Sequence, residues 1–145
     1  MDKFVNQLKI AFASQYAFAI KAQNYHWNVE GSDFYQLHNL FEDIYTEVYG
    51  AIDAFAENIR KIKAYTPASL ERFSALTEIS DEVEVLDPSA MVAELLRDAE
   101  KMQEIMKVLF TEAEARGENG LSNFLADRQD AFAKHAWFLR STLKD

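Results

Sequence analysis

Four side chains that could bind a metal lie in the segment HNLFEDIYTEVYGAIDAFAE, residues 38–57. His38 and Glu42 are four residues apart at its start, and Asp53 and Glu57 are four residues apart at its end. On an α-helix, residues four apart lie on one face, so each pair forms a two-ligand clip. Imidazole nitrogens and carboxylate oxygens bind divalent transition metals. The segment therefore predicts two half-sites for a metal.

A single helix cannot bring these two clips together. The step from Glu42 to Asp53 is eleven residues, or roughly 16 Å of helix, whereas a bond from a metal to a carboxylate oxygen is about 2 Å. The spacing is symmetric, however, about the midpoint between Glu47 and Val48. In an antiparallel copy of the helix, His38 would lie near Glu57 of the other helix, and Glu42 would lie near Asp53. The spacing thus predicts two whole sites in a two-fold dimer.

Composition restricts the classes of protein and of site. At 145 residues the chain predicts one domain, 1–145, that buries about 68–70% of its unfolded surface. The absence of cysteine excludes thiolate metal sites and disulfides and suits a reducing cytoplasm. A formal charge of −9, without a basic cluster or arm, disfavours direct DNA binding. Polar residues interrupt the first helix, so neither a signal peptide nor a membrane span is expected.

Helix-favouring residues dominate, and no stretch alternates with a period of two. We expect four long helices and one short one, with approximate bounds 2–28, 33–63, 70–76, 88–116 and from the 117–120 break to 143. Asp33 and Gln36 resemble a capping box at the start of the second long helix. Four long helices with a long connection between the second and third predict an all-α, four-helix bundle with a crossover, the ferritin-like arrangement.

The second long helix has two separable faces at about 100° per residue. One face is an apolar stripe that should pack in the core: Leu37, Phe41, Ile44, Val48, Ile52, Phe55, Ile59 and Ile62. The four ligand candidates point roughly 140° away from that stripe, out of the bundle. Gly50 lies at the edge of their face, where its missing side chain would let another helix approach. A core site within one chain is not expected, since no Glu-x-x-His pair occurs.

The segments YHWNVEG, FYQLHNLFEDIY and AIDAFAENI, with KHAWFLR near the end, resemble the mini-ferritins of the Dps (DNA-protection-during-starvation) family across most of the chain. That family's ferroxidase pattern is a His before Trp, a second His twelve residues later, an acid four further on, and then Asp and Glu four apart. The resemblance implies five iron ligands shared across a two-fold interface: His26, His38, Glu42, Asp53 and Glu57. Asp is common at the position of Glu42, but the neighbouring Asp43 points about 100° away.

The resemblance also implies a hollow dodecameric shell in which Fe(II) is oxidised by hydrogen peroxide or oxygen and stored as Fe(III) mineral, protecting against oxidative damage. Iron would enter through three-fold pores lined from the region of Glu118, Asp127 and Asp130, although these acids could simply be solvated charges. The sequence departs from the family in two respects. Ala64-Tyr65 replaces the usual glycine pair, and the Lys-rich arm that some members use on DNA is absent.

Two classes of function remain open. The first is the ferroxidase and iron store, where zinc could substitute for iron because divalent affinity rises towards copper and zinc. The second is a non-enzymatic architectural or nucleoid-associated cage of the same fold that binds another metal or none. Local packing offers simpler interpretations, with His26 packed beside Trp27 and the acid pairs solvated. We expect His135 at the surface or an interface, and Met91, Met102 and Met106 in the core.

Overall fold

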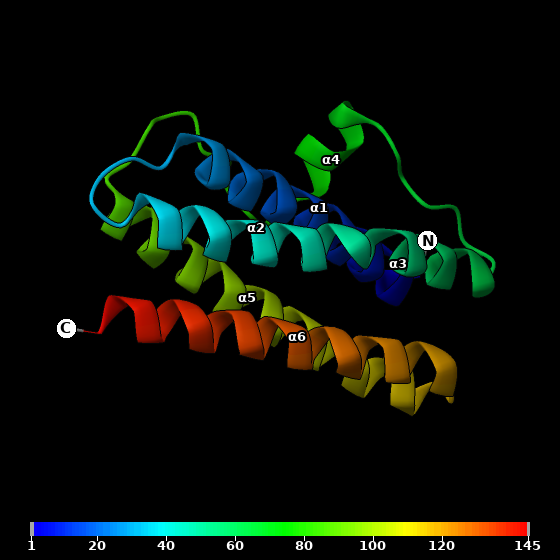
Figure 1. Cartoon of the computed structure of the whole chain (residues 1–145). Helices are drawn as coiled ribbons and strands as arrows, with labels where there is room; N and C mark the ends of the chain where they lie inside the picture. The colour runs from blue at the N-terminus through cyan, green and yellow to red at the C-terminus, as the bar shows by residue number, and fades with distance from the viewer. Residues whose placement is uncertain (1, 145) are drawn as a thin grey trace.

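The computed structural model describes residues 2–144, and helices are the only regular secondary structure in that range. They are α1 (Lys3–Asn28), α2 (Phe34–Gly50), α3 (Ile52–Lys61), α4 (Leu70–Leu76), α5 (Pro88–Ala115) and α6 (Asn119–Leu143). The bundle consists of α1, the consecutive pair α2 and α3, α5 and α6, while α4 lies in the crossover (Figure 1). The predicted all-α, ferritin-like four-helix bundle with a short crossover helix is confirmed.

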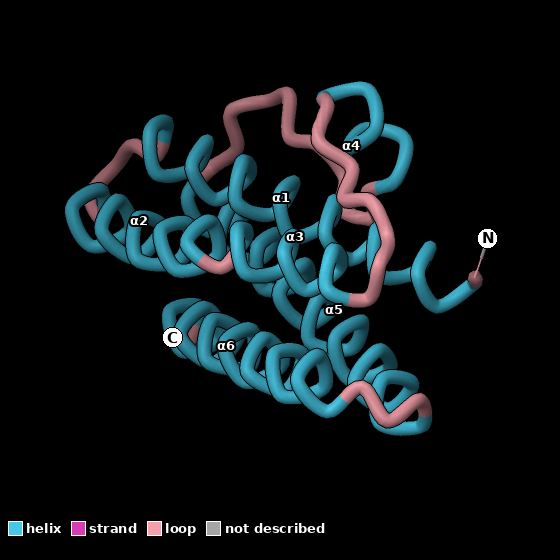
Figure 2. Tube along the Cα trace, turned by 90° about the vertical axis from the view of Figure 1, so that its right-hand side faces the viewer, coloured by secondary structure: helices cyan, strands magenta, loops and turns pink. Residues whose placement is uncertain are grey.

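The helices pack as two hairpins. Helix α1 runs beside α2, and α5 runs beside α6, while α1 also contacts α5 and so joins the hairpins (Figure 1). Figure 2 shows the crossover passing over α1 on its way from α3 to α5, with α4 packed on α1. None of the helices in residues 2–144 is both long and apolar enough to cross a membrane.

The predicted apolar stripe of α2 and α3 does face the core. Six of its eight members are buried and the other two, Ile52 and Ile62, are half-buried against the same cluster. Met91, Met102 and Met106 are fully buried, as expected. Burying such apolar surface is the main favourable contribution to folding. The stripe thus fixes which face of α2 and α3 is left for the ligand candidates.

The second long helix is not continuous, contrary to the prediction. It breaks at Ala51, which has φ −93° and ψ 0°. The Ala51 amide donates to the carbonyl of Val48, three residues back, at 3.3 Å. That carbonyl also accepts a 3.0 Å hydrogen bond from the side-chain amide of Gln15 on α1. A side chain that inserts into the backbone ladder is a recognised cause of helix distortion.

The helix ends follow local chemistry, with one exception. Asp2 caps α1 by accepting from the Phe4 amide at 2.9 Å, and Pro88 is the first residue of α5, as predicted. The capping box predicted at Asp33 does not form, because that side chain makes no capping hydrogen bond. At this end the Phe34 amide donates to the Gly31 carbonyl at 3.1 Å, within the turn that connects α1 to α2.

Candidate metal centre

Two histidines from different helices form a reciprocal pair. The rings of His26, in the last turn of α1, and His38, in α2, stack with centroids 3.9 Å apart and planes 20° apart. The Nδ1 atom of His26 lies 2.8 Å from the backbone oxygen of His38, and that of His38 lies 2.7 Å from the backbone oxygen of His26. Because a carbonyl oxygen only accepts, each Nδ1 carries a proton and donates it.

This hydrogen bonding determines which nitrogen can bind a metal. In a neutral imidazole whose Nδ1 is protonated, Nε2 keeps its lone pair and is the ligand atom. Within residues 2–144, neither Nε2 makes a hydrogen bond. The backbone of each helix thus orients the other helix's histidine as a ligand.

Aromatic packing further restricts both rings. Phe34 stacks on His38 with centroids 5.0 Å apart, and the Tyr45 ring lies 5.3 Å from that of His26. His26 is buried and His38 half-buried. The turn that brings these helices together contains Gly31 with φ +121°, a conformation that favours glycine. The two imidazoles are therefore held in place before any metal binds.

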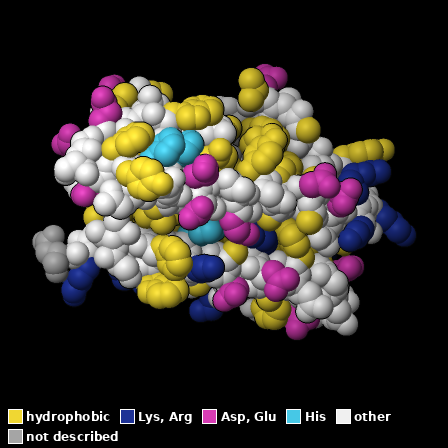
Figure 3. All heavy atoms as spheres, viewed as in Figure 1, with side chains coloured by type: hydrophobic (Ala, Val, Ile, Leu, Met, Phe, Trp, Pro, Cys, Tyr) yellow, Lys and Arg dark blue, Asp and Glu magenta, His cyan; other side chains and the backbone are white. Residues whose placement is uncertain are grey.

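The carboxylates lie where the helical spacing placed them. Glu42 is half-buried one turn after His38, whereas Asp53 and Glu57 are exposed on α3. No three His, Asp or Glu side chains in residues 2–144 converge closely enough to hold a metal. The structure thus brings His26 and His38 together but does not join Asp53 and Glu57 to them within one chain. Figure 3 shows histidine side chains among apolar ones on the face that α2 presents, with acidic side chains to one side.

Large aromatic side chains are exposed around this face. Trp27 follows His26 directly and is 64% exposed, and Tyr49 is 56% exposed. Tyr35, in the first turn of α2, is 74% exposed. Exposed aromatic side chains of this size are suited to contacts with another protein. The described subunit therefore has a candidate interface next to its histidine pair.

Glu47, half-buried on α2, forms a polar cluster with the buried side chains of Arg128 and His135 on α6, which was not predicted from the sequence. The Arg128 guanidinium donates to both carboxylate oxygens of Glu47, at 2.5 and 3.1 Å, and the Nε2 of His135 lies 2.7 Å from one of them. Burial raises the pKa of Glu47, but the hydrogen bonds from His135 and Arg128 and the charge of Arg128 outweigh it and lower the pKa to about 2.

Of the two positions expected for His135, the surface or an interface, the first is wrong, because the side chain is 7% exposed within the subunit. Its seven-residue spacing from Arg128 places both on one face of α6 and was the available signal. The three pore candidates are exposed: Glu118 precedes α6 as its N-cap, and Asp127 and Asp130 lie on that helix.

The model of the ferritin-like domain matches residues 5–145. A low temperature-induced protein of Nostoc is 30% identical, over 97% of this chain and 79% of its own length. Antigen TpF1 of Treponema pallidum is 32% identical, over 86% of this chain and 71% of its own. DNA protection during starvation protein 2 of Bacillus anthracis is 31% identical, over 85% and 84%.

The folds of solved structures superpose on nearly the whole of this chain. The crystal structure of antigen TpF1 superposes with a TM-score of 0.94 at 30% identity, covering 98% of this chain and 92% of that one. A Dps protein from Vibrio cholerae, described as a member of a superfamily of ferritin-like diiron-carboxylate proteins, gives 0.93 at 27% identity, covering 98% and 89%.

Proposed function

Since this chain belongs to the ferritin-like domain family, and within it to the Dps mini-ferritins, we propose that it is a ferroxidase and iron store. The observation that carries the proposal is the reciprocal histidine pair, in which both Nε2 atoms are left free by hydrogen bonds to the opposite backbone. Nitrogen and carboxylate oxygen ligands suit Fe(II). Iron is the substrate of this site, and it becomes the stored product.

The site is shared between two-fold-related subunits. His26, His38 and Glu42 come from one subunit, and Asp53 and Glu57 come from the other, so that each dimer holds two equivalent sites. Three features support this arrangement: the symmetric spacing along α2 and α3, the outward direction of the ligands, and the exposed aromatic side chains beside them. In addition, open space lies where a side chain at Gly50 would stand, so another helix can approach there.

The chemistry is an electron transfer that balances with either oxidant. Two Fe(II) ions each lose one electron, and hydrogen peroxide takes both electrons and two protons to become two water molecules. Oxygen, the alternative oxidant, takes the same two electrons and two protons to become hydrogen peroxide. The residues of this chain hold Fe(II) through imidazole and carboxylate groups, and the orientation of both rings is fixed beforehand, which reduces the reorganisation that metal binding requires.

The storage function requires an assembly. We place the Fe(III) mineral inside a homododecameric shell built from the two-fold dimers, in the cytoplasm, with residues 1–145 as one domain. Fe(II) would enter through three-fold pores lined by Glu118, Asp127 and Asp130. These features rest on family membership, and measuring the mass of the assembly in solution tests the first of them.

An anaerobic titration with Fe(II), followed by separate additions of oxygen and hydrogen peroxide, tests the proposal. We expect binding that saturates at a fixed ratio per subunit, and rapid oxidation with at least one oxidant. A variant with His26→Ala and His38→Ala should lose both while keeping the mass of the shell. Zinc added first should compete at the same stoichiometry. If the wild-type shell oxidises Fe(II) with neither oxidant, the architectural cage is the better description.

A further inference from the structure

A hydrogen-bonded network spans the bundle at the point where α2 ends and α3 begins. Gln15 on α1 is fully buried, and its amide donates to the Val48 carbonyl on α2 at 3.0 Å. Arg128 on α6, also buried, donates through Nε to the Gln15 side-chain oxygen at 3.3 Å. The same guanidinium holds Glu47, the residue before Val48. Three helices are thus joined at one short stretch of α2.

The direction of each hydrogen bond is determined. An arginine can only donate, so the Gln15 oxygen must face Arg128, and the amide nitrogen must then face Val48. The Nε2 of His135 lies 2.7 Å from Glu47 Oε1, the oxygen that also accepts from Arg128 Nη2. Every buried side-chain nitrogen and oxygen in residues 2–144 has a partner. A buried network that is fully satisfied in this way specifies one arrangement of the elements that it joins.

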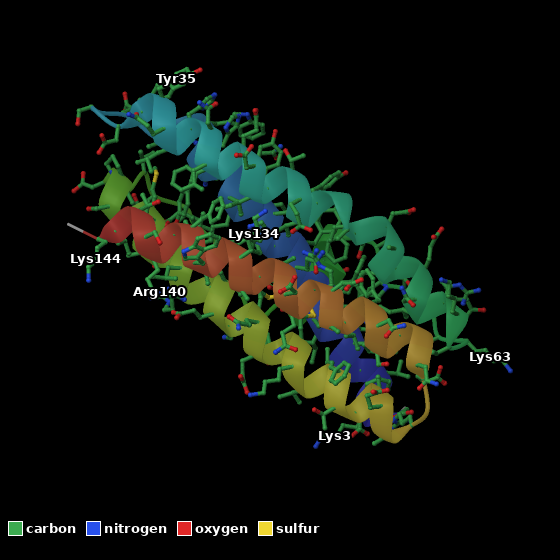
Figure 4. The ribbon with its side chains drawn as sticks, turned by 60° about the horizontal axis from the view of Figure 1, so that its bottom comes forward. Lys3, Tyr35, Lys63, Lys134, Arg140 and Lys144 are labelled. Carbon is green, nitrogen blue, oxygen red and sulfur yellow. The ribbon has the colours of Figure 1, made fainter. Side chains whose placement is uncertain are left out.

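The location of the network matters because the two half-sites lie on opposite sides of it. His38 and Glu42 precede the break on α2, and Asp53 and Glu57 follow it on α3. Figure 4 shows α2 and α3 running in sequence beside α6, from Tyr35 at one end to Lys63 beyond the other. In a two-fold dimer, each site combines α2 of one subunit with α3 of the other. The orientation of α3 relative to α2 therefore enters both sites equally.

We propose that Gln15, Arg128 and Glu47 are positioning residues that fix the orientation of α3 relative to α2, and thereby the distance between the histidine half-site of one subunit and the carboxylate half-site of the next. None of the three belongs to the ligand set. The inference rests on the proposed function only for its effect on metal binding. Its structural part concerns the helices alone and can be measured without metal.

Two substitutions at position 15 separate the contacts. Gln15→Met keeps the approximate shape but removes the hydrogen bonds to both Val48 and Arg128. Gln15→Glu keeps an acceptor for Arg128 and removes only the donor to the Val48 carbonyl. Ser14→Ala is the matched control, because Ser14 is an equally buried neighbour whose hydroxyl accepts from the Glu78 amide at 2.9 Å, away from the break.

The metal-free measurement is the distance between α2 and α3 in solution. The chain has no cysteine, so Gln36→Cys and Lys61→Cys can carry a pair of spin labels on exposed positions. Their backbones are about 37 Å apart along the helices. In shells where labelled chains are diluted with unlabelled ones, we expect one narrow distance distribution for the wild type and Ser14→Ala. Gln15→Met and Gln15→Glu should broaden or shift it.

The metal-binding measurement uses Co(II), whose visible spectrum reports its ligand geometry. We expect Gln15→Met and Gln15→Glu to weaken Co(II) binding by roughly tenfold or more, because losing a residue that orients metal ligands costs about 10- to 100-fold in affinity. Both variants should also change the Co(II) spectrum. Ser14→Ala should change neither the Co(II) affinity nor the spectrum.

If folded position-15 variants keep the wild-type distance distribution, the inference is overturned. If the distance changes but the Co(II) affinity and spectrum do not, the positioning role is overturned. If wild-type shells bind no Co(II), the proposed function fails, while the distances still decide the structural part.

Discussion

His26 and His38 are joined by two reciprocal hydrogen bonds. The Nδ1 of each imidazole donates to the backbone carbonyl of the other residue, at 2.8 Å from His26 and 2.7 Å from His38. Because both acceptors belong to the backbone, replacing one histidine by alanine removes a ligand but leaves the acceptor for the other ring. The pair is thus a preorganised element whose two members can be removed separately.

The acid that completes the histidine half-site can be distinguished from its neighbour. We predict that Glu42→Gln lowers the affinity for Fe(II) or Co(II) by at least the roughly 10- to 100-fold that loss of a ligand's supporting contact costs. Asp43→Asn, at an exposed position about 100° further around the helix, should stay near the wild-type affinity. Anaerobic titration of both variants measures this. The reverse result would make Asp43 the ligand.

The cluster around Glu47 predicts a particular acid dependence of stability. Its folded pKa of about 2 lies below the ordinary value of 4.5, so the unfolded chain takes up the proton first as the pH falls. The stabilisation is therefore complete above pH 4.5 and is lost as the pH falls towards 2. Because the side chain is 39% exposed, screening limits the effect to about 1 kcal/mol.

Glu47→Gln removes this titrating group and nearly keeps its shape. Denaturant unfolding at fixed protein concentration between pH 6 and pH 2 should show the wild type more stable at pH 6, with the difference shrinking as the solution is acidified. A difference that stays constant across this range would mean that the Glu47 carboxylate does not titrate as described.

A second buried ion cluster predicts a large effect on stability away from the metal site. Lys21 is buried with its Nζ 2.7 Å from Asp98 and 3.1 Å from Glu94. Burial raises the pKa of Asp98, against the opposing effect of Lys21. Lys21→Met should lower the free energy of unfolding by about 3–5 kcal/mol, because it leaves the buried Asp98 carboxylate without its cation.

The control for this prediction is Lys101→Met. That lysine is exposed, and it donates only to the Glu78 carbonyl, so the change should stay within about 0.5 kcal/mol. Equal losses for the two variants in denaturant unfolding would show that the cluster at Lys21 contributes nothing beyond an ordinary surface lysine.

The charge of the chain predicts weak binding to DNA. A formal charge of −9 per subunit repels the DNA phosphate backbone, and salt weakens this repulsion without turning it into attraction. We therefore expect negligible retardation of duplex DNA in gels at physiological salt near neutral pH. Retardation at sub-micromolar protein would contradict this prediction and would indicate a basic surface that forms only on assembly.

Local patterns in the sequence were sufficient for much of the fold. The bounds of the short helix Leu70–Leu76 agree with the expectation, and the buried stripe of α2 follows from spacing that any single helix reveals. The break at Ala51 was not predictable in this way. It involves Gln15, which is 33 residues from Val48 along the chain, and no helical periodicity links residues that far apart.

The site shows the same division between local and long-range information. The clips follow from four-residue spacing, which any helix converts to a shared face. The reciprocal hydrogen bonds of His26 and His38 depend on how α1 and α2 turn back on each other, and spacing carries no information on ring orientation. The burial of His135 was not predictable for a similar reason, because its partner Glu47 lies 88 residues away.

The central claim is that each metal site takes its ligands from two subunits, and co-assembly of two inactive variants tests it most directly. One variant carries His26→Ala and His38→Ala, and the other carries Asp53→Ala and Glu57→Ala. Each should be inactive alone. In a mixed dimer, one site combines both damaged halves, whereas the other takes its histidines from the second variant and its carboxylates from the first.

With equal amounts and random pairing, about half the dimers are mixed and half of their sites are whole, so roughly a quarter of the wild-type rate of Fe(II) oxidation should return. Mass spectrometry on co-expressed material confirms that mixed dimers are present. Recovery of about a quarter supports the shared site. No recovery in confirmed mixed dimers would contradict it, because sites contained within one chain cannot complement each other.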